Sequence, residues 1–119
     1  MTSADFDVVL YKVLRYAYSC LQAGTSPTVA KARELAGVNE AYLTAVFEDA
    51  KAHGYIDGPY VGHHADRPQP QLTETPWRIT SDGARFVDEN SRMAEARDFL
   101  GGPFASALAS AVSATLQAF

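Results

Sequence analysis

The sequence has only one cysteine, Cys20, among its 119 residues. A single cysteine cannot form an intrachain disulfide bond, so the fold must rest on a hydrophobic core, which a chain of this length can build. Cys20 falls on the apolar face of the first predicted helix, where we expect a core residue. No charged start followed by an apolar run and a cleavage site follows Met1. We therefore expect no secretory signal and a cytoplasmic location.

Basic residues are also scarce: ten Lys and Arg stand against fourteen Asp and Glu, which gives a formal net charge of −4. A protein that binds nucleic acid through its overall charge would be basic, so any DNA binding must come from a local patch. The sequence lacks a glycine-rich phosphate loop, a nucleophile elbow and a paired-carboxylate signature. We expect no enzyme and no cofactor.

A metal site has weak support in this sequence. His53, His63, His64 and Asp66 are the candidate ligands. They show neither the histidine pair four residues apart nor the paired cysteines that are typical of metal sites, and adjacent histidines point apart in an extended chain. We expect no bound metal.

Periodicity predicts a long first helix over residues 5–23, ended by Gly24. Its apolar face comprises Phe6, Val9, Leu10, Val13, Ala17, Cys20 and Leu21. Its polar face comprises Lys12, Arg15, Ser19 and Gln22.

Two short helices are predicted next, the second beginning at Ser26-Pro27 and ending at Gly37, the third capped by Asn39 and closed by His53-Gly54. Two short helices joined by a tight turn that contains glycine are typical of a helix-turn-helix.

The segment after the third helix alternates between strand and loop signals. Tyr55-Ile56 begins a short strand, residues 57–76 have the composition of a loop, and Trp77-Arg78-Ile79 reads as a return strand. This hairpin would be the wing of a winged helix. Thr80 is predicted to cap a fourth helix, and a fifth restarts near Asn90-Ser91.

The fold class predicted from this order is mainly α with a small β-hairpin, a winged helix-turn-helix followed by additional C-terminal helices. We expect residues 1–100 to form the winged helix-turn-helix domain and residues 101–119 to form an added helix.

Charge is absent from Gly101 to the last residue. On a helical wheel the apolar side chains of this tail form one stripe, with the serines opposite. The stripe has the members Phe104, Leu108, Val112, Thr115, Leu116 and Phe119. The tail is shorter than the ~20 strongly apolar residues of a membrane span, so we expect no membrane.

Such a stripe must be covered, because each large apolar side chain gains about 1.5–3 kcal/mol on full burial. We predict a homodimer through this helix, with Phe104, Leu108, Val112, Leu116 and Phe119 as interface candidates, since two-fold homodimers are the commonest assembly. The alternative is that the stripe folds back on Tyr11, Leu14 and Tyr18 of the first helix.

The run from Ile79 through Thr80-Ser81-Asp82-Gly83 to Glu89-Asn90-Ser91-Arg92-Met93 resembles the YjcQ-type family. The segments 11–21 and 54–58 are similar to the first helix and the third-helix exit of the same family. These are small winged-helix proteins that are common in phages and prophages. The resemblance covers roughly residues 5–100 and implies a winged-helix fold and a phage or prophage setting. It carries no catalytic residues.

In a helix-turn-helix the second helix of the pair meets base edges in the major groove. The DNA-contact candidates are Thr44 and Lys51 on the third helix, with His63, His64 and Arg67 in the wing. Between residues 26 and 52, however, three basic residues stand against four acidic ones. The predicted function, implied by the fold and by the resemblance to the YjcQ-type family, is DNA binding or transcription regulation of the phage type. The alternative is a protein-protein interaction module, with a host or phage protein as partner and no DNA binding.

Overall fold

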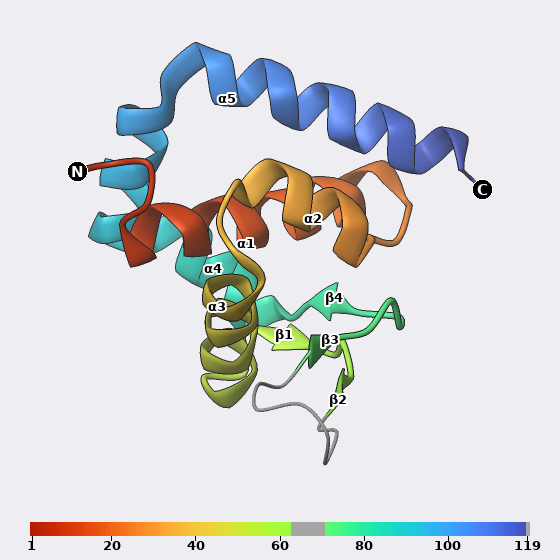
Figure 1. The fold of residues 1–119 in the computed structure, drawn as a ribbon. Coiled ribbons are helices and arrows are strands. Elements are labelled where there is room, and N and C mark those ends of the chain that lie inside the picture. Colours follow the sequence, from red (N-terminus) through yellow and green to blue (C-terminus); the bar gives the residue numbers. More distant parts are fainter. Residues whose placement is uncertain (63–70, 119) are drawn as a thin grey trace.

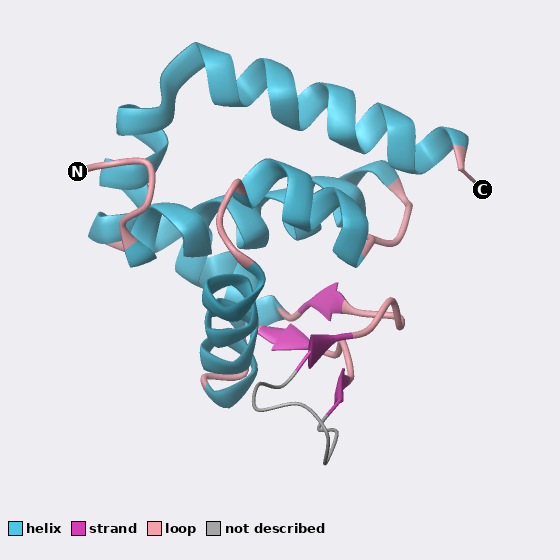
Figure 2. Ribbon diagram, viewed as in Figure 1, coloured by secondary structure: helices cyan, strands magenta, loops and turns pink. Residues whose placement is uncertain are grey.

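The computed structural model describes residues 1–62 and 71–118, and this part of the chain is mainly helical (Figures 1 and 2). The helices are α1 (Phe6–Ala23), α2 (Val29–Ala36), α3 (Glu40–Ala52), α4 (Ser81–Glu89) and α5 (Ser91–Gln117). Two small antiparallel sheets pair β1 (Ile56–Asp57) with β4 (Arg78–Ile79) and β2 (Val61–Gly62) with β3 (Gln71–Leu72). The predicted class, mainly α with a small β component, is confirmed. The β2–β3 pair lies within the segment that we predicted to be loop.

α1 is the central helix of the molecule, because α2, α3, α4, α5 and β4 all pack against it. It is buried on several sides, which a simple two-faced pattern does not anticipate. Lys12, predicted to be exposed, is buried, and its Nζ donates to the carbonyl oxygen of Ala36 at 3.4 Å. Phe6 and Leu21, predicted to be inner residues, lie at the ends of α1 and are exposed.

The predicted helix ends are largely confirmed. Gly24 and Gly37 adopt left-handed conformations after α1 and α2, as the sequence predicts for glycines that end helices. The start of α2 was predicted wrongly: Thr28 is its N-cap, and the Thr28 hydroxyl accepts from the backbone N–H of Lys31. Asn39 and Thr80 cap α3 and α4 as predicted.

The β1–β4 pair closes the core beside α3. Ile56 lies opposite Ile79, and both are buried. Trp77, just before β4, packs edge-on against Phe47 of α3 with their ring centroids 4.9 Å apart. α4 lies so close to the segment that leads into β1 that a Cβ on Gly83 would clash with the carbonyl oxygen of Tyr55.

α5 bends at Gly101, which has the non-helical dihedral angles φ 59° and ψ −150°. The predicted break at 101–103 is therefore present as a bend, and the chain then continues as a helix to Gln117. Figure 1 shows the second part of α5 running over α1 and α2, at the opposite end of the molecule from the β2–β3 pair.

Candidate functional site

Two surfaces contain the candidate residues: the surface formed by α2, α3 and the adjoining strands, here called the α2–α3 surface, and the face of α5 that points away from the core. On the first of these, Thr44 is not available to a ligand. It is 2% exposed, and its hydroxyl donates to the carbonyl oxygen of Glu40, one turn earlier, at 2.8 Å. The expectation that Thr44 flanks an exposed face is wrong, because α3 turns this residue toward the core.

Lys51 lies on the exposed side of α3, near its end. Its Nζ donates to the carbonyl oxygen of Pro59 at 3.0 Å, which ties the last turn of α3 to the segment after β1. No carboxylate of the described ranges, 1–62 and 71–118, forms an ion pair with Lys51, so its charge is not neutralised there. The remaining DNA-contact candidates, His63, His64 and Arg67, lie outside the described residues.

The two cations of α2 are bound to carboxylates of the same chain. The guanidinium of Arg33 donates to both oxygens of Glu40, from Nε at 2.8 Å and from Nη2 at 2.9 Å. Lys31 pairs with Glu34 at 3.1 Å. The hydrogen bond from Arg33 is the main reason that the pKa of Glu40 lies below its ordinary value. Both oxygens of Glu40 are therefore committed to Arg33, and Arg33 is oriented toward α3 rather than outward.

The N-terminus of α2 is occupied by a side chain that the sequence analysis did not single out. Glu74 follows β3, and its two carboxylate oxygens accept from the backbone N–H groups of Val29 at 2.7 Å and Ala30 at 3.0 Å. A helix N-terminus is a natural site for an anion such as phosphate. Here a carboxylate of the chain fills it. No local signal links residue 74 to residue 29, because the contact depends on the tertiary fold.

The acidic residues of α3 add further negative charge to the α2–α3 surface. Glu48 is exposed and Asp49 is half-buried, and the side chain of Asp49 lies 3.6 Å from Nδ1 of His53. The exposed alanines Ala41, Ala45 and Ala52 offer no hydrogen bond to a base edge. Apart from Lys51, the described α2–α3 surface thus presents paired cations and carboxylates.

α5 places part of the predicted dimer stripe against its own chain. Phe104 packs on Tyr11 with their ring centroids 5.9 Å apart, and Leu108 and Val112 are half-buried against the core. For these three residues the structure has the alternative that we considered, in which the stripe folds back on the first helix. Leu116 is 44% exposed, and Phe119 lies outside the described residues.

A buried hydroxyl pair fixes the second half of α5. Thr115 donates to the carbonyl oxygen of Ala111, and Tyr16 of α1 donates to the Thr115 hydroxyl at 2.8 Å. The Tyr16 oxygen also accepts from the backbone N–H of Thr28 at 3.1 Å. Because burial raises the pKa of Tyr16, it stays neutral and keeps the proton that it donates. One tyrosine therefore joins α1, the start of α2 and α5.

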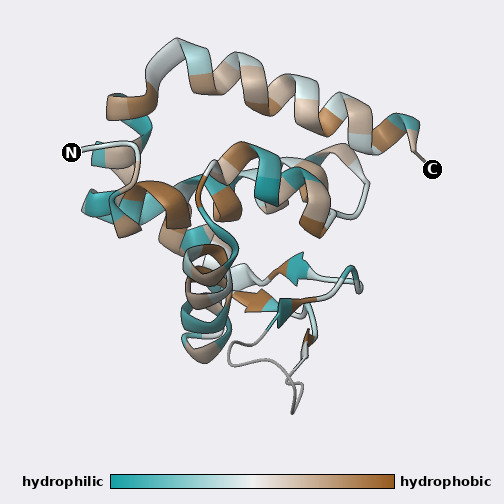
Figure 3. Cartoon of the chain, viewed as in Figure 1, coloured by the Kyte–Doolittle hydropathy of each residue, from teal (hydrophilic) through white to brown (hydrophobic). Residues whose placement is uncertain are grey.

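After the bend at Gly101, the opposite face of α5 is exposed and uncharged. Figure 3 shows pale and brown residues along this second part of the helix until its last turn. Its exposed members include Ala105, Ala107, Ala109, Ser113 and Leu116. Beside it runs an open groove of about 400 Å³ against α1, lined by Ser19, Leu108, Ala109, Val112, Leu116 and neighbouring residues.

By length and composition, Ser91–Gln117 is a helix that could cross a membrane, with a mean hydropathy of 1.4 in its most apolar window, of which 17% is buried. The bend at Gly101 shortens the straight uncharged part to residues 102–117. Such a segment is about 24 Å long at 1.5 Å per residue, less than the ~30 Å of a bilayer core.

Within residues 1–62 and 71–118, no three His, Cys, Asp or Glu side chains lie together as a possible metal site. Of the metal candidates only His53 is described, and there it stacks on Tyr55. Cys20 is buried as predicted, and burial raises the pKa of its thiol. Comparison of the chain with protein-family models, with curated proteins and with solved structures gave no match.

Proposed function

We propose that this chain is a winged-helix protein that acts as a homodimer through α5 and works by protein contact rather than by reading DNA. The order of elements supports the winged-helix part: α2 and α3 follow each other across Gly37, Val38 and Asn39, and the antiparallel strands come next. The resemblance of residues 79–93 to the YjcQ-type family supports the same fold and a phage or prophage setting.

The observation that carries the proposal is the uncharged outer face of α5 after its bend at Gly101. No Lys, Arg, Asp or Glu occurs from Gly101 onward, and most side chains of this segment are exposed. Charged side chains are depleted from the cores of protein interfaces. A second copy of the same face matches it without burying an ion, and a two-fold axis would place each groove beside the partner's helix.

The α2–α3 surface supports the second part of the proposal. Phosphate binding depends on free cations and open backbone N–H groups. Here Arg33 and Lys31 are paired with carboxylates, and Glu74 accepts from the first N–H groups of α2. A DNA backbone would have to displace three carboxylates from this surface.

DNA binding is the second candidate function. It is favoured by Lys51, which lies at the exposed end of α3 without an ion-pair partner among the described residues. In that case Lys51 and Arg67 would contact phosphates, and replacing both with glutamate would weaken binding and reduce its salt dependence.

Sedimentation velocity of the full chain tests the proposal. The expected result is a dimer at about 100 μM, a concentration that detects even weak self-association. Leu116→Glu and Ala109→Glu should each give a monomer, since each places a charge on the exposed face of α5. Ala41→Glu introduces the same charge at an exposed position of α3. It is the control and should leave the dimer intact.

A monomeric parent chain would overturn the homodimer. So would a dimer that persists in both α5 variants. Co-sedimentation of the chain with phosphatidylcholine vesicles, lost in Leu116→Glu, would assign the same face to a membrane and would also overturn the proposal.

A further inference from the structure

Three aromatic rings stack on one another at the surface between the end of α3 and α4. The ring centroid of Tyr55 lies 5.4 Å from that of His53, with an interplanar angle of 18°, and 4.3 Å from that of Phe86, with an angle of 16°. None of the three belongs to the buried core: His53 is exposed, and Tyr55 and Phe86 are half-buried. The face of an aromatic ring attracts a cation, and a ring that is partly exposed can still receive one.

The backbone holds these rings in place. The N–H of Tyr55 donates to the carbonyl oxygen of Ala50 at 2.9 Å, and the carbonyl oxygen of Tyr55 accepts from the N–H of Thr80 at 2.9 Å. Gly83 lets α4 come close, because a Cβ there would clash with the same carbonyl oxygen. Tyr55 and Phe86 are therefore fixed relative to each other before any ligand arrives, which lowers the entropic cost of binding.

An open hollow of about 400 Å³ lies beside the rings of Tyr55 and Phe86. Its lining residues are Tyr55, Asp82, Arg85, Phe86, Glu89 and Asn90. Arg85 pairs with Asp82 at 2.8 Å, so these two charges offset each other. Glu89 is exposed, and its carboxylate forms neither an ion pair nor a hydrogen bond with any residue of the ranges 1–62 and 71–118. The hollow therefore combines aromatic surface with one carboxylate that has no partner in the described part of the chain.

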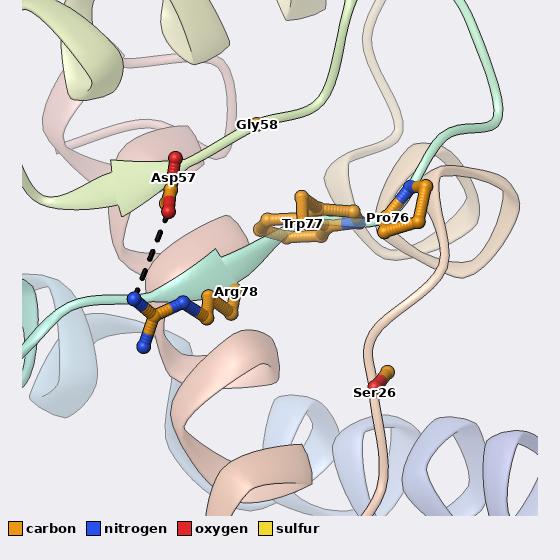
Figure 4. Close-up of a pocket in the computed structure, with 6 residues that line it drawn as sticks. All are labelled: Ser26, Asp57, Gly58, Pro76, Trp77 and Arg78. Carbon is orange, nitrogen blue, oxygen red and sulfur yellow. Dashed lines mark ion pairs between the residues drawn. The ribbon is translucent and has the colours of Figure 1, made fainter.

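A second hollow, beside Trp77, differs in its charges. Figure 4 shows that the carboxylate of Asp57 there already faces the guanidinium of Arg78. The distance from Arg78 Nη2 to Asp57 Oδ2 is 3.7 Å, so this hollow carries no excess charge. The excess negative charge is found in the hollow beside Tyr55 and Phe86, which is the one that suits a cation.

We propose that the hollow beside Tyr55 and Phe86 binds an arginine side chain of a partner protein. The guanidinium lies against these two rings and pairs with the carboxylate of Glu89. A guanidinium is planar and weakly hydrated, so it suits both stacking on an aromatic ring and bidentate pairing with a carboxylate. An ammonium group is more strongly hydrated and does not stack, so lysine fits less well. Glu89 repels an anion, and an apolar group would desolvate its carboxylate without giving it a partner.

This contact goes beyond the homodimer and does not depend on it. No lining residue of the hollow belongs to the part of α5 after Gly101. The volume lies at the small end of the range of ligand pockets, which suits one side chain that anchors a larger interface. The contact adds the chemistry of a partner to the protein-contact role proposed above.

An NMR titration of the isotope-labelled full chain provides the test. The probe is the peptide acetyl-Gly-Ser-Gly-Arg-Gly-Ser-Gly-amide, at about 100 mM salt to screen weak long-range attraction. The amide signals of Tyr55, Phe86 and Glu89 should shift saturably, with a Kd below about 5 mM. The same peptide with citrulline keeps the shape of arginine without its charge and should bind at least about fivefold more weakly. The lysine peptide should bind at least about twofold more weakly. Free L-arginine carries a carboxylate that Glu89 repels, so it should bind no more tightly than the peptide.

Variants locate the site. Glu89→Gln removes an exposed charge and should weaken binding at least about threefold. Phe86→Leu keeps an apolar side chain and removes the ring, and it should weaken binding by a similar factor once circular dichroism has shown that it folds. Glu34→Gln removes an exposed carboxylate of α2, outside the hollow, and should bind like the parent chain.

A Kd above about 5 mM, or shifts that leave out these three amide signals, would overturn the proposal. Equal binding of the citrulline or lysine peptide, tighter binding of free L-arginine, or unchanged binding in Glu89→Gln would also overturn it. Sedimentation velocity decides the dimer separately, so the failure of either proposal can be told from the failure of the other.

Discussion

The α2–α3 surface and the outer face of α5 differ in the charge of their exposed side chains. On the first, charged groups are plentiful but find partners within the chain, as Arg33 does with Glu40. On the second, no residue after Gly101 is charged, and the exposed side chains are mostly alanine and serine, with Leu116 and Gln117 near the end. The comparison shows that a surface rich in charged residues can offer few free cations, since Lys51 is the one α2–α3 cation without an ion-pair partner among the described residues. An uncharged helix face, by contrast, exposes side chains that an interface can bury without desolvating ions.

The largest expected effect comes from removing the inner contacts of α5. A chain that ends at Gly101 loses the half-buried Phe104, Leu108 and Val112 and exposes Tyr16. We expect its free energy of unfolding to fall by roughly 3–5 kcal/mol, as the sum of lost apolar burial and one lost hydrogen bond. Urea denaturation followed by circular dichroism measures this. A chain that ends at Gln117 is the control, and equal stability of all three chains would show that α5 does not belong to the core.

A smaller loss is expected when a single hydroxyl under α5 is removed. Thr115→Val keeps the shape of the side chain but leaves the Tyr16 hydroxyl without its acceptor. Since Thr115 is 1% exposed, the unfolding free energy should fall by about 1–2 kcal/mol. Ser113→Val, on the exposed side of the same helix, should change it far less. Equal effects of the two substitutions would contradict the inward orientation of Thr115.

On the α2–α3 surface, Glu74→Gln should cost about 1 kcal/mol, because the neutral amide is a weaker acceptor for the N–H groups of Val29 and Ala30. Thermal and urea unfolding measure the change. Glu89→Gln, at an exposed position of α4, is the control and should leave the unfolding free energy almost unchanged. A stability unchanged in Glu74→Gln would mean that the carboxylate does not hold the start of α2.

The smallest expected effect depends on pH. The pKa of Glu40 is lowered from 4.5 by the hydrogen bond from Arg33, so this pair stabilises the fold above about pH 4.5. The contribution is lost as the pH falls through the lowered pKa of the folded state. Because both side chains are about 40% exposed and solvent screens them, we expect at most about 0.5 kcal/mol. The stability difference between the parent and Glu40→Gln should be largest at pH 7 and shrink below pH 4, and a difference that grows in acid would refute this.

Sequence patterns predicted the local features of the fold well. Asn39 and Thr80 cap α3 and α4, glycine ends α1 and α2, and α5 begins at the restart predicted near Asn90-Ser91, because these signals act within a few residues. The buried position of Cys20 was also predicted, since it follows from the apolar face of one helix.

The tertiary contacts were beyond the same patterns. Lys12 was assigned to the polar face of α1, but packing of α2 against that face buries it. Thr44 was placed on an exposed flank of α3, but it is buried. Periodicity within α3 does not say which neighbouring elements cover a residue. Glu74 reaches the start of α2 from a segment 45 residues away, so no local pattern identifies it. The paired state of the α2 cations likewise depends on side-chain geometry that a charge count does not contain.

The most direct test of the account is the titration of a fluorescent random-sequence DNA duplex with the full chain, followed by anisotropy at about 50 mM salt, where phosphate contacts are strong. With its α2 cations paired and Glu74 at the α2 N-terminus, the chain should show no binding up to about 10 μM protein. Binding in that range that weakens linearly with the logarithm of salt concentration, and that is lost in Lys51→Glu with Arg67→Glu, would contradict the account and establish the second candidate function.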